Sequence, residues 1–524
     1  MASTFHSIET AKRSLFTQTA ALGTTGHNIA NANTEGYSRQ RVNMSASRPM
    51  EAYGINRSVA PGQLGTGVEY GSITRIREGF LDVQYRNEST AYGSWVIQSD
   101  SLDKLEGIFN EPSDTGIRTV LDNFWNAWSD LSKDPENVTA RKIVKENAQA
   151  LTDALNYMSG QLTNLGTDLT TNVGVKANEA QSYLTSIAEL NESITRIEGL
   201  GDNANDLRDQ RDLLTDKLAR IMNISVQDTE QGYSISLGGQ ALVVGGQVQV
   251  QVNAGATAAE QGAFLENAYA AGTLTGGEVY GMILSREKYV KDYSNQLNDL
   301  ANTIANGEIK ITLPAGSVLP SGVSVTAVDG STVSGTISSP KEVVVKGLNG
   351  LHQLGYTLDG TATPGLPFFT FEGNSTNAAA NIKLNQAIAS NPNLIASSLR
   401  TEGTGTATTV IKGNNTLAML MGNLKLTNFQ SVDGNREATM DSYYSSMVGQ
   451  LGVQSQEALR QTENSTVLLQ QVESSRQSVS GVSLDEEMAQ MIKFQHAYSA
   501  AARFMTTFDQ MLDKLINSTG VVGR

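Results

Sequence analysis

The C-terminal stretch from Ser483 to Asn517 reads SLDEEMAQMIKFQHAYSAAARFMTTFDQMLDKLIN, and its pattern decides how the chain ends fold. Apolar residues recur there at two positions of a seven-residue repeat. The two sets are Leu484, Met491, Tyr498, Met505 and Leu512, and Phe494, Ala501, Phe508 and Leu515. Such an a/d pattern, sustained over about four heptads, is typical of a coiled coil. We therefore expect one long helix with an apolar seam.

The start of this helix is also signalled. Ser483 and Glu486 have the spacing of a capping box, and Asp485, Glu486 and Glu487 suit the positive end of a helix dipole. At 1.5 Å per residue the helix would be about 50 Å long.

The N-terminal segment carries a matching stripe. Ile8, Leu15, Leu22 and Ile29 share one heptad position. Neither terminal stripe is covered by its own sequence neighbours, so we expect the two helices to pack on each other and on further copies of the chain. Two amphipathic helices buried in an ordinary globular core would give the same periodicity, and the pattern alone leaves both interpretations open.

Composition narrows the class of protein. With 524 residues, the chain should form three or four domains of roughly 150 residues each. Cysteine is absent, which excludes disulfides, Cys-ligated metals and thiol nucleophiles. The 38 basic and 53 acidic residues give a net charge of −15, which argues against a general nucleic-acid binder. We expect no membrane span and no secretory signal peptide, as in a cytoplasmic protein or one exported by another route.

The pattern along the chain predicts an α+β multidomain protein: long terminal α-helices forming a coiled coil, a helical rod-like domain and inserted β domains. The predicted segments are 1–60, the N-terminal coiled-coil helix and an extended stretch; 61–221, helical rod; 222–277, a small β module; 278–305, a rod helix; 306–375, an inserted β domain; 376–479, helical rod; and 480–524, the C-terminal coiled-coil helix.

Finer patterns add local expectations. A further heptad-like seam is expected in the helical middle, made of Val173, Ala180, Ile187 and Ile194 with Tyr183, Leu190 and Ile197. The other expectations are strands at 233–237, 241–244 and 248–252 joined by Gly-Gly turns, a helix break at 199–205, a loop at 253–275, and helices at 378–399 and 416–478.

Motifs that would indicate catalysis are missing from the sequence. The four histidines are scattered, no HExxH or GxSxG occurs, and no Gly-Lys pair exists for a phosphate-binding loop. We therefore expect no enzyme, cofactor or metal site, although a hydrolase built from scattered acids is a further alternative. The densest charge cluster is residues 208–212, Arg-Asp-Gln-Arg-Asp. It fits a functional ion-pair network, but a solvated helix face or a helix–helix lock is the simpler interpretation.

Three segments carry a resemblance to a known family. Residues 28–40, NIANANTEGYSRQ, resemble the signature that follows the first helix of bacterial flagellar rod, hook and hook-associated proteins. The Ser-Arg-Gln ending points within that group to the hook-associated protein 1 (FlgK) family. Residues 205–212 and 480–487 are similar to that family's mid-chain helix and to the start of its C-terminal helix. One departure is Glu35, where the family often has proline.

The first motif can also be interpreted from its residues. Asn and Thr side chains bond to nearby backbone, and glycine permits a positive φ, so the segment should end the first helix and reverse the chain. The aromatic ring of Tyr37 and the planar guanidinium of Arg39 would then be available for contacts with other segments. The predicted turn residues are Asn31, Asn33, Thr34, Gly36, Tyr37 and Arg39. The simpler alternative is that they only shape a turn.

The resemblance implies a structural subunit of the flagellum that joins hook to filament, without catalysis or cofactor. It implies export in the unfolded state through the flagellar type III channel, from the cytoplasm to the outside of the cell. The expected partners are the hook protein, the second hook–filament junction protein, further copies in a ring and an export chaperone at the C-terminal helix. The alternative is a secreted adhesin- or matrix-like protein that binds a ligand through its β domain.

Overall fold

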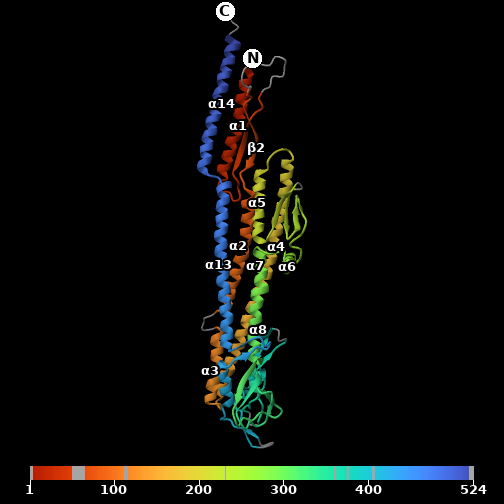
Figure 1. Ribbon diagram of the computed structural model, residues 1–524, viewed down its shortest axis with the longest axis vertical. Helices are drawn as coiled ribbons and strands as arrows, with labels where there is room; N and C mark the ends of the chain where they lie inside the picture. The colour runs from red at the N-terminus through yellow and green to blue at the C-terminus, as the bar shows by residue number, and fades with distance from the viewer. Residues whose placement is uncertain are drawn as a thin grey trace, which may run out of the picture. The chain divides into compact units, whose positions relative to one another are not determined.

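The computed structural model describes residues 4–49, 65–110, 116–229, 232–358, 362–373, 377–403 and 408–518 (Figure 1). Parts of the predicted segments 1–60 and 480–524 thus lie outside the described residues. The chain divides into two compact units. Unit 1 comprises Met1–Trp95, Val173–Tyr280 and Thr462–Arg524, and unit 2 comprises Val96–Asn172 and Gly281–Gln461. The α+β multidomain class predicted from the sequence is confirmed.

Four helices contribute residues to both units, because the divisions fall inside them. They are α2 (Gly79–Phe109), α4 (Val138–Glu198), α7 (Glu278–Leu284) and α13 (Met440–Ser480). In the described part of the chain, no helix is both long enough and apolar enough to cross a membrane.

In unit 1 the two terminal helices pack on each other. Helix α1 (Thr4–Ala30) and helix α14 (Leu484–Ser518) lie side by side in Figure 1. They run antiparallel, since Asn28 near the end of α1 bonds to Glu487 in the first turn of α14. A two-stranded antiparallel ribbon, β1 (Gln40–Ala46) and β2 (Val68–Arg75), packs on α1, and the Thr17 hydroxyl donates to the carbonyl oxygen of Val68.

The long seam of α4 within unit 1 is buried, with one shift from the expected positions. Val173, Ala180, Ile187 and Ile194 are buried at one heptad position. The second buried row is Ala177, Leu184 and Asn191, which lies one residue away from the predicted Tyr183 and Leu190. A break at 199–204 then separates α4 from α5 (Asn205–Ile221), close to the predicted break.

The small sheet of unit 1 follows the predicted strands. Its order is β3 (Ser225–Thr229), β4 (Gly232–Leu237), β5 (Gln240–Val244) and β6 (Gln247–Val248). Gly238 and Gly239 have φ of +55° and +88°, and two positive φ values are what the tight hairpin turn between β4 and β5 requires. The predicted strand at 248–252 is shorter than expected, because pairing with β5 ends at Val248.

The predicted loop at 253–275 is wrong over its middle, which forms helix α6 (Ala258–Ala270). A complete capping box starts this helix: the Thr257 side chain accepts from the Glu260 N–H, and Glu260 accepts from the Thr257 N–H. Alanine has the highest intrinsic helix propensity, so an Ala-rich stretch after such a cap favours a helix.

Unit 2 contains a six-stranded antiparallel sheet. The strand order is β16 (Glu437–Ala438), β15 (Phe429–Gln430), β7 (Glu308–Leu313), β10 (Lys341–Lys346), β8 (Ser324–Ala327) and β9 (Thr332–Ser334). Ile309, Ile311 and Leu313 alternate with exposed residues along β7, as expected for a sheet with one covered face. The sheet thus takes two strands from outside the predicted β domain at 306–375.

The predicted helix at 416–478 is confirmed at its two ends and wrong at 424–439. After α12 (Thr416–Asn423), the chain forms a 3₁₀ turn η5 (Leu424–Leu426) and the β15–β16 hairpin before α13 begins. The hairpin turn is built around Asp433, whose carboxylate accepts the N–H of Asn435 and the hydroxyl of Ser431. Side-chain bonds of this kind favour turns over helix.

Residues 378–399 also depart from the predicted helix. They form α10 (Ala378–Asn381), β12 (Ile382–Leu384), α11 (Gln386–Ser390) and the 3₁₀ turn η3 (Pro392–Leu394). Strand β12 pairs with β11 (Phe369–Phe371), and a further short pair is β13 (Thr401–Glu402) with β14 (Thr409–Val410). Asn385 caps α11 and Asn391 caps η3. Each cap begins a new short helical segment, so one continuous helix does not form.

The remaining helices of unit 2 are α3 (Ile117–Lys133), the π-helical η1 (Ser285–Val290), α8 (Lys291–Asn306) and α9 (Gly347–Gln353). An aromatic cluster joins α3 and α9. Phe124 and Trp128 of α3 contact Phe368 at ring-centroid distances of 6.0 and 5.5 Å. His352 of α9 packs edge-on against the same Phe368 ring at 5.3 Å.

His352 is held neutral by this core. Its Nδ1 lies 2.5 Å from the carbonyl oxygen of Leu366, and its Nε2 lies 2.8 Å from the N–H of Ala396. Since Nε2 accepts, the proton resides on Nδ1. Burial lowers the pKa of His352 to about 4, and the buried cation of Arg141 also lowers it.

Acidification should therefore destabilise unit 2. The unfolded chain takes up a proton at His352 near pH 6.5, whereas the folded chain resists it until about pH 4. The stability contributed by neutral His352 is complete above pH 6.5 and decreases as the pH falls toward 4, by about 3 kcal/mol at the lower end. Urea unfolding followed through Trp125 and Trp128 measures it. His352→Gln should flatten this part of the pH profile, and His496→Gln, on exposed α14, should not; equal slopes in all three proteins would contradict the assignment.

Candidate functional site

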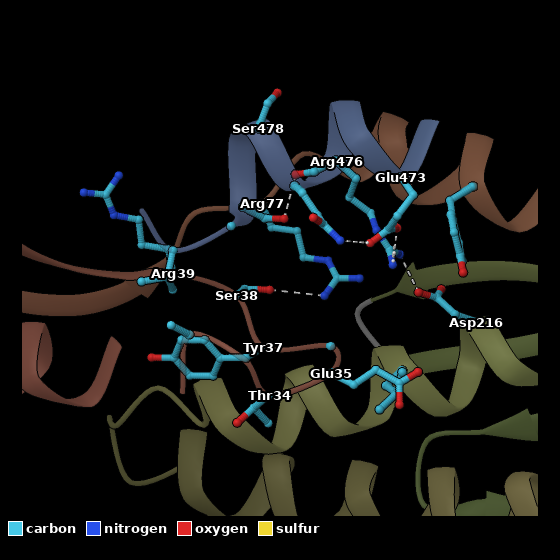
Figure 2. Close-up of a pocket in the computed structure, with 18 of the residues that line it drawn as sticks. Thr34, Glu35, Tyr37, Ser38, Arg39, Arg77, Asp216, Glu473, Arg476 and Ser478 are labelled. Carbon is cyan, nitrogen blue, oxygen red and sulfur yellow. Dashed lines mark hydrogen bonds and ion pairs between the residues drawn. The ribbon is translucent and has the colours of Figure 1, made fainter. Parts of the chain in front are cut away.

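The main cleft of unit 1 lies where the terminal helices join the rest of the unit (Figure 2). It has a volume of about 830 Å³. Five elements line it: the turn after α1 (32–39), the start of α2, helix α5, the end of α13 and the start of α14. The predicted turn residues 33–39 thus meet the segment 480–487, and the bonded pair Arg39 and Glu487 is 448 residues apart in the chain.

The turn after α1 is closed by its own polar side chains. Asn31 Nδ2 donates to the carbonyl oxygen of His27, and the Thr34 hydroxyl donates to Asn31 Oδ1. Gly36 has a φ of +79°, and a Cβ there would lie 3.0 Å from the Leu213 side chain of α5. Both a left-handed backbone and a close approach therefore require glycine at this position. Asn33 and Thr34 are exposed at the tip.

Asn28 connects the end of α1 to the strand that follows the turn. Its Nδ2 donates to the carbonyl oxygen of Gln40 at 2.9 Å, and its Oδ1 accepts the Gln40 N–H at 3.0 Å. The amide thus pairs with β1 as a neighbouring strand would. Oδ1 also accepts the Tyr37 hydroxyl, and Nδ2 also donates to Glu487 of α14. Burial, with nearby Asp206 and Asp209, raises the pKa of Tyr37, which keeps this donor protonated.

Asn28→Ala should destabilise the joint, because it removes hydrogen bonds to three buried or half-buried partners. These are the Gln40 backbone, the Tyr37 hydroxyl and the Glu487 carboxylate. We expect a loss of about 2–3 kcal/mol in the free energy of unfolding of unit 1. Hydrogen exchange of α1 and β1 amides measures it. Asn33→Ala in the same turn, where the side chain is exposed, should leave protection unchanged. Equal protection in the two variants would show that the Asn28 bridge contributes nothing.

Arg39 is a further turn residue with defined contacts. Its backbone N–H donates to the carbonyl oxygen of Ser480, at the end of α13. Its side chain pairs with Glu487 through Nε at 2.6 Å and with Glu486 through Nη1 at 2.7 Å. Figure 2 shows this side chain pointing away from Arg77 and Arg476.

The charge cluster of α5 forms a buried ion-pair network. Asp209, Asp212 and Asp216 lie on one face of the helix and are 5–6% exposed. Arg75 reaches Asp209 at 2.6 Å and Asp212 at 3.0 Å. The solvated-face interpretation of this cluster is therefore wrong. The ion pairs join α5 to other elements, as the helix–helix lock interpretation expects, and a functional role for the network stays a prediction.

The network continues into α2 and α13. Asp216 pairs with Arg86 of α2 at 2.7 Å and with Arg476 of α13 at 2.5 Å (Figure 2). Arg77 forms a two-pronged pair with Asp82 at 2.6 and 2.9 Å. One cluster of charges thus connects β2, α2, α5 and α13.

The pKa shifts follow from burial and these pairs. Burial would raise the pKa of Asp212, but the charges of Arg77 and Arg75 outweigh it and lower the value. For Asp209 burial dominates and raises the pKa, despite Arg75 and the Ser38 N–H. Burial opposes the charge of Arg77, yet the bond to Asp82 and the charge of Asp212 raise its pKa. The charges of the network are thus committed to one another, which suits a structural joint. Among the described residues, no cluster of His, Asp and Glu has the arrangement of a metal site.

Sequence reasoning missed the basic half of this network. The missed residues are Arg75, Arg77, Arg86 and Arg476, with Asp82. A signal was present: Asp209, Asp212 and Asp216 are spaced i, i+3 and i+7, which places three carboxylates on one helix face. Partners so distant in sequence carry no comparable local signal.

The predicted seam of α14 is partly covered within a single chain. Met491, Phe494, Met505, Phe508 and Leu512 are half-buried and Ala501 is buried. Leu484, Tyr498 and Leu515 are 49, 41 and 53% exposed. Three predicted seam positions therefore lie outside the face that packs within the chain.

On α1 the buried face is made of small residues. Ala11, Thr17, Ala21 and Asn28 are 1–2% exposed, whereas the predicted Ile8, Leu15, Leu22 and Ile29 are half-buried. Small side chains let neighbouring elements approach the helix closely. The larger predicted residues stay available for further packing, and their role in assembly stays a prediction.

Comparisons with known proteins agree across the whole chain. Residues 102–307 match the family described as flagellar hook-associated protein FlgK helical domain. Residues 473–518 match the flagellar basal body rod FlgEFG protein C-terminal family. The chain is 35% identical to flagellar hook-associated protein 1 of Bacillus subtilis (strain 168), over 100% of both chains. It is 24% identical to that of Escherichia coli (strain K12), over 97% of this chain and 99% of the other.

A solved structure has a similar fold. It is that of the flagellar hook junction protein FlgK from Burkholderia pseudomallei, with a TM-score of 0.50, 16% identity, and coverage of 75% of this chain and 100% of that one. With 35% identity to a relative along its entire length, the chain belongs to the flagellar hook-associated protein 1 family.

Proposed function

We propose that this chain is a structural subunit of the bacterial flagellum that joins the hook to the filament. The observation that carries the proposal is the full-length similarity to hook-associated protein 1, which includes both terminal segments. The buried charges of the joint are paired with one another, which supports a mechanical role over a catalytic one. This similarity favours the junction role over an adhesin- or matrix-like protein.

Self-association would proceed through α1 and α14. Packing on α1 leaves large apolar side chains of α14 in water; Leu484, Met488, Ile492, Phe504 and Met511 are 44–57% exposed. Burying them against further copies in a ring would be favourable, at about 25 cal/mol per Å² of apolar surface. The interface would comprise these exposed residues together with the predicted ones, which are Ile8, Leu15, Leu22, Ile29, Leu484, Met491, Phe494, Tyr498, Met505, Phe508, Leu512 and Leu515.

The partners follow from the family. The hook protein would contact the subunit on one side and the second hook–filament junction protein on the other. Before assembly the chain would pass unfolded through the flagellar export channel, with a dedicated chaperone on α14. Its final location would be outside the cell, at the hook–filament junction.

Location tests the proposal directly. Flagella sheared from cells should carry this chain, at a low and fixed ratio to the filament subunit. Deleting its coding region should leave hooks without filaments and release filament subunits into the medium. Chain found on the cell surface of hook-less mutants, in wild-type amounts, would instead support the adhesin-like alternative.

A further inference from the structure

The connection between the last two helices of unit 1, α13 and α14, is short. Helix α13 ends at Ser480 and α14 begins at Leu484, so three residues separate two long helices. The cap of α14 is local: the Glu486 N–H lies 3.5 Å from the Ser483 hydroxyl, and the Glu487 N–H donates to the Ser483 carbonyl oxygen. This cap starts the helix but does not set its direction.

The first turn of α14 is bonded to the end of α1 and to the turn after it. In the part of the chain that the structure describes, the polar side-chain contacts between the first turn of α14 and other segments come from two residues, Arg39 and Asn28. Arg39 is the one that also holds the end of α13, through its backbone N–H to Ser480. It thus touches both sides of the three-residue break.

The two carboxylates on Arg39 differ in environment. The side chain of Glu487 is 4% exposed and also accepts from Asn28 at 3.0 Å, whereas that of Glu486 is 63% exposed. A buried, hydrogen-bonded pair is costly to break, while an exposed pair contributes little. The guanidinium reaches both carboxylates because its donors are fixed in a planar fork, which a lysine ammonium does not offer.

We propose that Arg39 is a positioning residue that latches the α1–α14 pair in one direction relative to α13 and α5. With the latch closed, the break at 481–483 and the turn at 31–36 are held as one joint. With the latch open, the break at 481–483 and the turn at 31–36 act together as a hinge, and the contacts of His27 with Asp206 and of Asn28 with Gln40 limit how far the terminal pair moves. This inference extends the proposed function, because the orientation of the terminal helices would decide how a subunit enters the ring.

Because the chain has no cysteine, introduced cysteines can carry spin labels at chosen positions, and these labels can test the latch. Gln471→Cys on α13 and Gln495→Cys on α14 are both at exposed positions and would carry a pair of spin labels across the joint. Asn87→Cys on α2 with Gln471→Cys gives a reference pair that does not cross the joint. Pulsed electron–electron double resonance then reports both distance distributions in the full-length chain. The measurement is made on the free chain and on chain bound to purified hooks, where excess unlabelled chain keeps labelled copies apart.

Wild type should give one narrow distribution across the joint. Arg39→Ala and Glu487→Gln should broaden it about twofold, since each disrupts the buried half of the latch. Arg39→Lys should give an intermediate width, and Glu486→Gln should change little because its pair is exposed. Arg13→Ala, which loses only a surface pair with Glu9, is the matched control and should resemble wild type.

Three results would overturn the latch: a broad wild-type distribution, an unchanged width in Arg39→Ala, or equal broadening of the reference pair. The last would mean that Arg39 only stabilises unit 1 as a whole. Failure of the wild-type chain to bind hooks would count against the junction role instead. The free-chain distances would still decide the latch in that case.

Discussion

Asp216→Ala should be among the most destabilising single changes in unit 1, with an expected loss of about 3–5 kcal/mol in its free energy of unfolding. The carboxylate lies between Arg86 at 2.7 Å and Arg476 at 2.5 Å, and it is 6% exposed. Its removal leaves two guanidinium groups close together without their shared counter-charge. Hydrogen exchange of amides in α5 and in the end of α13 measures the opening of this region.

Two variants separate the loss of the buried charge from the loss of a carboxylate in general. Glu9→Ala removes a carboxylate of unit 1 that is 50% exposed and pairs with Lys12 and Arg13 on the same helix, so it should cost under about 0.5 kcal/mol. Asp216→Asn keeps an acceptor but not the charge, and it should fall between the two. If Asp216→Ala costs no more than Glu9→Ala, the network does not stabilise the joint.

Elements with a strong local signal could be predicted from the sequence. Helix α14 begins one residue after the expected cap, Ser483, and strands β4 and β5 flank the Gly238-Gly239 turn. In these cases cap, periodicity and turn residues agree. Helix α6 was missed although its cap signal, Thr257 with Glu260, was present, because Ala/Gly-rich composition was interpreted as loop.

Features that depend on distant partners could not be predicted. Nothing in residues 429–438 indicates that β15 pairs with β7, more than 100 residues earlier. The α4 seam was predicted with one row a residue away from the buried one, since Asn191 is buried by bonding to the carbonyl oxygen of Gly245. A polar residue buried by a tertiary contact does not register in a hydrophobic pattern.

The residues of the candidate site also fall into two groups, those with a local signal and those that depend on distant partners. The turn residues 31–39 could be predicted because Asn, Thr and Gly have local conformational preferences. Their partner Glu487 was assigned only to the helix dipole, yet it is almost fully buried between Arg39 and Asn28. Whether a carboxylate is buried depends on which segments pack together, and the neighbouring residues in sequence carry no signal for this.

Phe508→Asp should abolish assembly while leaving the free chain folded. Phe508 is half-buried on the packed side of α14, with its ring 4.7 Å from that of Phe504. In the free chain the new carboxylate can turn toward water, so we expect a cost of about 1–2 kcal/mol. In a ring of terminal helices the same position would be closed on all sides, and an unpaired charge there costs several times more.

The measurement adds purified variant to hooks from cells that lack this chain, and then counts filaments that grow after filament subunits are supplied. Adding protein directly avoids the export step, so a defect in chaperone binding does not enter the result. Gln510→Asp, two residues away on the exposed side, introduces the same charge and should assemble normally. Normal filament growth with Phe508→Asp would place this face of α14 outside the ring interface. Gross unfolding of the free variant would instead mean that α14 belongs to the folding core of unit 1, because assembly and monomer stability would then depend on the same contacts.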